Sequence, residues 1–365
     1  MATEFLQSYL EDTQFIPTSS VSSISATTDS LRVDVELSCE NGRNGNPETF
    51  YTTTLYAFGD VVELSDVGSL VEEYFRQRGK VADIITITFD DVSLDVHFLY
   101  SEYWQPYQQG FDPQKMFFLS AMAQRVHQDS IVTIASEDHG SNIPFVIKAV
   151  GHRASDGTIA VVSKSEYRTL STRLSTAFRV HDIIEWALNH TDAEAGDDLR
   201  DVMYFSIEYG GVQKMFYIVP APAYLTFSFA NAFNVIEYVD VVGEMTSKTE
   251  VSRDVVVCDG KSRQYDRTIE RTFQMQTEQL TADEVSILEQ LIASHHVALV
   301  LDSDEVDVIV TDHTCEPSTD GEALTTVKFT WQFADNRPRV FSSLMDGVIP
   351  PRRQIFDDTF SPEYE

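Results

Sequence analysis

Apolar and polar residues alternate with a period of two in several segments, which predicts strands that bury one face. The first clear strand is Leu31–Leu37, and the last is Thr326–Asn336. The cleanest hairpin lies between Asp83 and Phe98, with its turn at Asp90-Asp91. The pattern predicts a mainly β chain.

Three short segments have apolar residues at helical spacing instead. They are Asp66–Phe75, His181–Asn189 and Thr281–Ala293. The third has the strongest start signal, because Thr281 and Glu284 are spaced as a capping box. The fold class predicted from the residues is therefore β-rich α+β, with short helices flanking the strands.

One order of elements occurs three times: a β-run, a helix, a hairpin and a closing strand with aromatic and small residues. Such internal repetition sets the architecture before any local motif is considered. The β-runs are Phe50–Phe58, Arg173–Val180 and Thr268–Thr277, and the closing strands are Met116–Arg125, Leu225–Asn234 and Thr326–Asn336. We expect three related β modules that hold neighbouring subunits in place.

The module boundaries follow from this order and from composition. Residues 1–30 are rich in Ser and Thr and are expected to form an extended N-terminal arm. Residues from 343 onward combine Pro350-Pro351 with charged residues and are expected to form a C-terminal tail. The three modules are predicted at 31–125, 126–235 and 236–342.

The chain is strongly acidic, with 58 acidic against 26 basic residues and a formal net charge of −32. This charge argues against specific nucleic-acid binding and against docking on anionic lipid. Simple solubility explains it, although an acidic wall would also let DNA slide past without sticking. No apolar run has the length of a membrane span. The three cysteines are far apart, which suits assembly in a reducing cytoplasm.

No motif of a nucleophile elbow, phosphate loop, dinucleotide site or zinc protease occurs in the sequence. His295-His296, His313 and Cys315 are a weak metal candidate, because adjacent residues of an extended segment point to opposite faces. We therefore expect no catalytic residues, no cofactor and no metal. One aromatic cluster is a candidate partner contact, although it could equally seal a core: Tyr100, Tyr103, Trp104 and Tyr107.

Two segments, Thr311–Arg339 and Glu237–Arg253, resemble structural tail proteins of tailed phages and prophages of gut Bacteroidetes. The resemblance covers about the last third of the chain and carries no site residue with it. It implies repeated β-sandwich or barrel modules of the tail-tube type. It also implies a virion protein, assembled in the host cytoplasm, that forms a ring in the tail.

The length and the three modules favour a distal tail or baseplate hub component, linking the tail tube to the tip, over a single-domain tube subunit. Its expected partners are further copies of itself and other tail proteins, with phage DNA passing through the lumen. Two alternatives stay open: a receptor- or carbohydrate-binding virion module, which exposed aromatic residues such as Trp104 would favour, and a cell-wall hydrolase of the tail, which would need two converging carboxylates.

Overall fold

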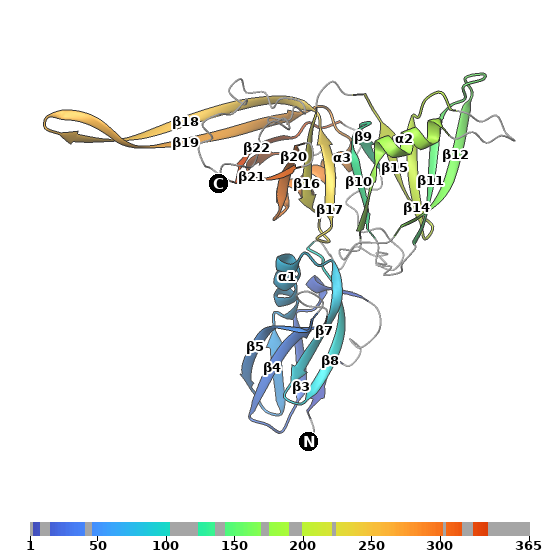
Figure 1. Ribbon diagram of the computed structural model, residues 1–365. Coiled ribbons are helices and arrows are strands. Elements are labelled where there is room, and N and C mark those ends of the chain that lie inside the picture. The colour runs from blue at the N-terminus through green and yellow to red at the C-terminus, as the bar shows by residue number, and fades with distance from the viewer. Residues whose placement is uncertain are drawn as a thin grey trace, which may run out of the picture.

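The computed structural model describes residues 3–7, 15–40, 46–102, 123–135, 143–168, 175–189, 199–220, 224–301, 304–315 and 324–334. The fold is mainly β, with three α-helices in these ranges, as the sequence predicts. It has three modules (Figure 1): the first in blue, the second in green, and the third in yellow to red. No helix among the described residues is long and apolar enough to cross a membrane.

The first module has a five-stranded sheet of order β2-β8-β7-β4-β5 and a small sheet of order β1-β3-β6. The helix α1 lies between the two hairpins in sequence. The elements are β1 (Glu4–Phe5), β2 (Ile16–Pro17), β3 (Ser23–Thr27), β4 (Arg32–Cys39), β5 (Glu48–Tyr56), β6 (Val61–Ser65), α1 (Val67–Arg78), β7 (Ala82–Phe89) and β8 (Val92–Leu99).

The second module repeats this pairing. The strand before the first hairpin pairs with the strand before the helix, and the first strands of the two hairpins pair with each other. Its large sheet has the order β12-β11-β14-β15-β9. The elements are β9 (Ala123–Val126), β10 (Ile131–Ala135), β11 (Ile143–His152), β12 (Ile159–Arg168), β13 (Ser175–Arg179), α2 (Val180–Leu188), β14 (Tyr204–Tyr209) and β15 (Val212–Ile218).

The third module keeps the order of helix, hairpin and strand but pairs its strands differently, in one sheet of order β17-β16-β20-β21-β22-β19-β18. The hairpin just before its helix, β18 and β19, is much longer than those of the other modules, and only the base of β19 joins the sheet, beside β22. The elements are β16 (Leu225–Ala230), β17 (Ile236–Val241), β18 (Gly243–Cys258), β19 (Lys261–Thr277), α3 (Ala282–Ala293), β20 (Val297–Leu301), β21 (Asp304–Thr314) and β22 (Lys328–Phe333).

The prediction of an extended N-terminal arm is wrong for residues 15–30, which are described and folded. Strand β3 pairs with β6, and Ile24 and Ala26 are fully buried in the core of the first module. The stretch before β3 packs tightly on α1, because the N–H of Gly68 donates to the Val21 carbonyl at 2.9 Å. A Cβ on Gly68 would meet the Thr18 carbonyl oxygen at 2.1 Å, so only glycine fits there.

Two predicted closing strands belong to the module that follows them. Strand β9 pairs in parallel with β15 of the second module, and β16 pairs with β20 of the third. The predicted boundaries at 125 and 235 therefore fall too late. Alternation identifies a strand with one buried face, but it does not identify the strand's partner. The predicted tail at 343–365 lies outside the described residues.

Each module has its own apolar core, with Phe75 in the first, Phe145 in the second and Trp331 in the third. A fourth, small cluster lies where all three modules meet and contains Val81, Leu99, Ala135 and Val235. Burial of each large apolar side chain contributes roughly 1.5–3 kcal/mol. The modules are thus separately built and share one apolar joint.

Candidate functional site

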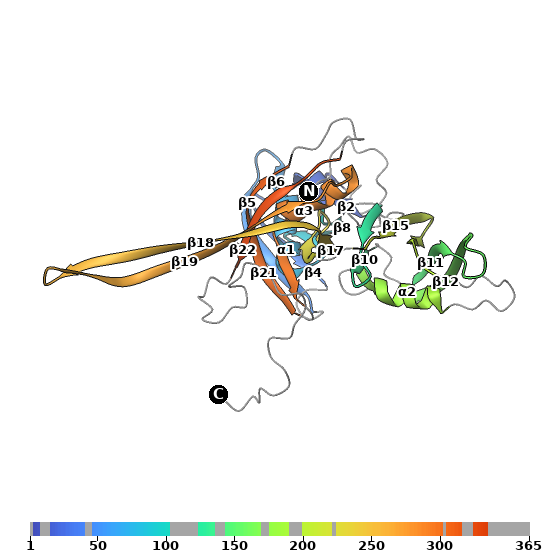
Figure 2. The ribbon, with the colours of Figure 1, turned by 90° about the horizontal axis from the view of Figure 1, so that it is seen from above.

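The most distinctive surface is the hairpin of β18 and β19, here called the arm (residues 243–277). Figures 1 and 2 show it projecting from the third module, on the side opposite the second module. The strands pair from Gly243 and Thr277 at the base to Cys258 and Lys261 at the tip. The turn is Asp259-Gly260, with φ of 53° and 71°, which is the favoured chemistry of a two-residue hairpin.

No second layer covers the outer part of the arm in the described structure. Its large apolar residues are exposed to solvent there: Val251, Val255, Val256, Val257 and Tyr265. Two strands alone are marginally stable in water, because neither face is packed against a core. The unpaired edges of such a ribbon are also free to pair with another chain. The arm therefore has the properties of a surface that another protein covers.

The register of the arm places like charges opposite one another. Glu250 pairs with Glu270 across the two strands. Like charges directly across a sheet destabilise it. Because residues alternate between faces, the described side chains at this level include two arginines and no acid on one face, and three acids and one lysine on the other. The basic face consists of Thr249, Val251, Arg253, Ile269 and Arg271.

The arm also differs from the rest of the chain in charge. It contains six of the 26 basic residues and six of the 58 acidic residues, so its net charge is zero. The whole excess of 32 negative charges therefore lies outside it. A basic face on a neutral arm is complementary to the acidic body of another copy of this chain.

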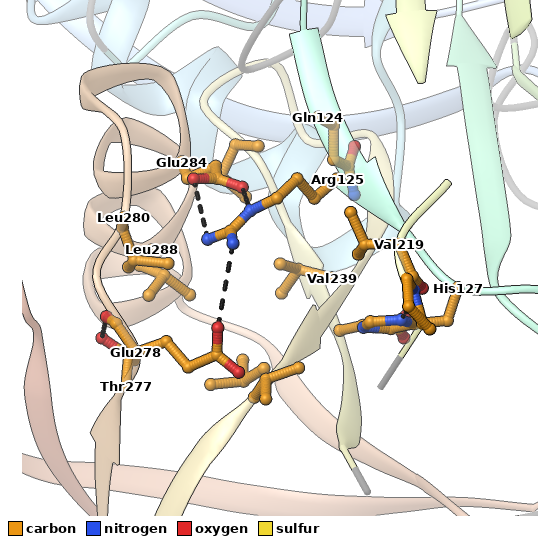
Figure 3. Close-up of a pocket in the computed structure, with 15 residues that line it drawn as sticks. Gln124, Arg125, His127, Val219, Val239, Thr277, Glu278, Leu280, Glu284 and Leu288 are labelled. Carbon is orange, nitrogen blue, oxygen red and sulfur yellow. Dashed lines mark hydrogen bonds and ion pairs between the residues drawn. The ribbon is translucent and has the colours of Figure 1, made fainter. Parts of the chain in front are cut away.

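A cavity of about 210 Å³ lies at the joint between the second and third modules (Figure 3). Its walls come from β9, the two residues after β15, β17, the end of β19 and the first half of α3. Arg125 crosses the cavity from β9 and pairs with Glu284 of α3, and its guanidinium also approaches Glu278 at 3.8 Å. The lining is mixed apolar and polar, with Val219, Val239 and Leu288 on the apolar side.

The polar groups of this cavity already satisfy one another. Besides Arg125, Glu284 accepts the Thr281 N–H at 2.8 Å, and the Thr281 hydroxyl accepts the Glu284 N–H at 3.4 Å. These are the two bonds of the predicted capping box. The imidazole of His127 is bonded to the Val219 carbonyl at 2.8 Å. The arrangement ties the two modules together and gives Glu284 a structural role.

The structure brings only part of the predicted aromatic cluster into view. Tyr100 is fully buried in the core of the first module, where its hydroxyl donates to Glu102. Its burial raises its pKa and leaves no exposed face, so Tyr100 does not fit the predicted surface contact. Tyr103, Trp104 and Tyr107 lie outside the described residues, and their role stays a prediction.

The four residues of the weak metal candidate do not form a metal-binding cluster in the described structure: His295, His296, His313 and Cys315. No group of three or more His, Cys, Asp or Glu in the described ranges is arranged to hold a metal ion. His295 lies 3.8 Å from Glu102 of the first module, and its burial lowers its pKa although Glu102 acts in the opposite direction. Cys315 lies instead near Glu289 of α3, with sulfur and oxygen 3.8 Å apart.

The arm was not predicted from the sequence, in which only one β-run at 268–277 was expected there. The signal that could have found it is Asp259-Gly260 between two long stretches of similar length. Comparison with known proteins adds no further indication. No model of a protein family matches the sequence, and no protein of curated function is significantly similar to it.

Proposed function

We propose that this chain is a non-catalytic structural protein that assembles into a ring through its arm. The ring is a distal tail or baseplate hub component of a phage tail, linking the tail tube to the tip. The arm is the single observation that supports assembly most directly. The assignment to a phage tail rests on the resemblance at Thr311–Arg339 and Glu237–Arg253.

In the proposed ring, the basic face of the arm lies on the acidic body of the next copy. A strand of 16 residues spans about 50 Å at 3.3 Å per residue. A module of about 100 residues has a radius of gyration of about 13 Å, so the arm is long enough to cross a neighbouring module. The contact is head-to-tail, which closes into a ring when the rotation per subunit permits.

Contact with a neighbour removes the cost of the isolated ribbon. Arg253 and Arg271 meet carboxylates of the neighbouring copy, and Val251 leaves water. The carboxylates outside the arm that do not meet an arm are then available to line the lumen, where they would repel DNA. An assembled ring with its carboxylates only on the outer wall would contradict this last element of the proposal.

The decisive experiment compares the oligomeric state of the full chain with that of a charge-reversed variant, Arg253→Glu/Arg271→Glu. Sedimentation velocity and negative-stain images should show a closed ring for the wild type and a monomer for the variant. The ring should dissociate as salt is raised, because its contacts are exposed charges. Arg32→Glu, a reversal at an exposed position of the first module, should leave the ring intact.

Two outcomes would overturn the assembly role: a wild type that stays monomeric at all concentrations, or a variant that assembles as well as the wild type. The location in the tail is tested separately. Gold-labelled antibody against the chain should bind tailed particles at the distal end of the tail. Label on the capsid or on no particle would reject the phage assignment while leaving ring formation to the first experiment.

A further inference from the structure

A lysine is fully enclosed at the joint between the second and third modules. Lys214 of β15 has 1% of its side chain exposed, and its ammonium nitrogen lies 5.4 Å from the centre of the Phe216 ring. Its charged neighbour is Glu237 of β17, also buried, with Nζ and Oε2 4.0 Å apart. Burial of an ion pair costs several kcal/mol per ion, so stability alone is a weak reason for this arrangement.

The same carboxylate holds a buried asparagine. Asn231 follows β16, is 2% exposed, and donates its Nδ2 to Oε1 of Glu237 at 2.5 Å. Its carboxamide oxygen accepts two main-chain N–H groups, those of Phe233 at 2.9 Å and Val235 at 3.1 Å. The two donors fix the orientation of the amide, since only an oxygen can accept them.

This set of contacts matches what the attack of a lysine amine on an asparagine carboxamide requires. Two N–H groups on one carboxamide oxygen polarise the C=O bond and would stabilise an oxyanion formed on it. The amide nitrogen, which would be the leaving group, already touches a carboxyl group that can supply a proton. A turn needs the two bonds to the Asn231 oxygen, but it needs neither Lys214 nor Glu237.

The amine is also in a suitable state. Burial lowers the pKa of Lys214, although Glu237 acts in the opposite direction. A desolvated lysine reaches its neutral, nucleophilic form more readily than an exposed one. Buried lysines of lowered pKa therefore recur as nucleophiles.

We propose that Lys214 and Asn231 form an intramolecular isopeptide bond, with Glu237 as the catalytic residue that carries the proton. The bond would join β15 of the second module covalently to the segment after β16 of the third. This inference is independent of the proposed ring, because it concerns the chain within one subunit.

The reaction balances without any outside reagent. The lone pair of Nζ attacks Cγ of Asn231, and the negative charge moves to Oδ1, between the N–H groups of Phe233 and Val235. Glu237 takes a proton from Nζ and gives one to Nδ2. The bond between Cγ and Nδ2 then breaks, ammonia leaves, and a secondary amide remains. Glu237 returns to its starting state, and no oxidation or reduction occurs.

Intact-mass spectrometry of the purified full chain tests the proposal. The measured mass should be lower than the sequence mass by one molecule of ammonia. Trypsin should fail to cleave after Lys214, giving one peptide that covers 201–248 with the same deficit. Chymotrypsin cleaves between the two residues, and the fragments that contain Lys214 and Asn231 should stay joined.

The variants Glu237→Gln and Lys214→Met should both have the full sequence mass. The matched control is Lys148→Arg. Lys148 lies in the same sheet and also pairs with a glutamate, Glu208 at 2.6 Å, but this pair is partly exposed. The Lys148→Arg variant should keep the ammonia deficit of the wild type.

A wild-type chain of full sequence mass would overturn the proposal, and this measurement does not depend on the folding of any variant. A deficit that persists in Glu237→Gln would overturn the role of Glu237. A deficit that maps to Asn44-Gly45 would identify a cyclic imide in place of a cross-link.

Discussion

Asn234 of the third module donates its side-chain amide to the main-chain carbonyl of Lys80, at 2.9 Å, just beyond the end of α1. The same nitrogen reaches the carbonyl of Phe75 in the last part of that helix, at 3.1 Å. Asn234 is 3% exposed and has a φ of 60°. The Phe75 carbonyl also accepts the Lys80 N–H at 2.9 Å, so the Asn234 amide adds to the main-chain cap of a helix in another module.

Asn234→Gly removes this amide but keeps a residue that tolerates the left-handed backbone. We expect a loss of about 1–3 kcal/mol, because two carbonyls of the first module each lose the hydrogen bond from this buried amide. Asn234→Ala should be less stable than Asn234→Gly by about 1 kcal/mol, because a Cβ is strained at this φ. Denaturation curves of the two variants test the order, and equal stability of Asn234→Gly and the wild type would contradict it.

Arg125→Ala should loosen the joint seen in Figure 3, because Glu284 keeps a mostly buried carboxylate without its cation. Loss of a hydrogen bond to a charged group costs about 1.5–3 kcal/mol. Hydrogen exchange of the β9 amides should accelerate, since β9 holds the second module against α3. Arg32→Ala breaks an exposed pair with Asp34 and should change stability by about 0.5 kcal/mol or less.

Asp201 should make the stability of the second module depend on acid. The N–H of His152 donates to its carboxylate at 2.9 Å and is the main cause of its lowered pKa. A carboxyl whose folded pKa is depressed stabilises above its ordinary pKa of about 3.9 and loses this contribution as pH falls through the folded value. Wild type and Asp201→Asn should therefore differ at neutral pH and converge in acid.

The melting midpoint as a function of pH measures this convergence. Asp91→Asn, at the exposed turn between β7 and β8, is the control and should follow the wild-type curve. A constant difference between wild type and Asp201→Asn from pH 7 to pH 2 would contradict the assignment.

Two of the three cysteines should react very differently with a thiol reagent. Cys39 is fully buried, and desolvation raises its pKa to about 11. Cys258 is exposed next to the turn of the arm. Because the thiolate is the reacting form, Cys258 should react in the folded chain and Cys39 only after unfolding. Cys258→Ser should remove the fast phase, and fast labelling of Cys39 without denaturant would refute this.

The parts of the fold that local patterns determine were predictable. The capping box of Thr281 and Glu284 is confirmed, and the hairpin predicted between Asp83 and Phe98 is observed as β7 and β8. Both signals act over a few residues, since a cap and a turn need only neighbouring positions. The buried face of each strand then follows from its alternation.

Pairing between distant segments was not predictable. Nothing within Ala123–Val126 indicates that this strand lies beside β15, whose paired residues come 92 positions later in the chain. The arm escaped detection because neither face of its outer part is buried, so that part shows no regular apolar alternation. Lys214 is flanked by Gln213 and Met215 and resembles an exposed strand residue, and the third module is what encloses it.

The parallel pairing of β9 with β15 has a consequence for how the chain is threaded. The main-chain N–H of Val219 donates to the carbonyl of Val126, so the chain enters and leaves the second module at neighbouring points. Four residues of strand separate these points by only about 10 Å. The second module is therefore an insertion between the first and third modules. It can be removed or replaced by another domain without a change in the path of the chain through the first and third modules.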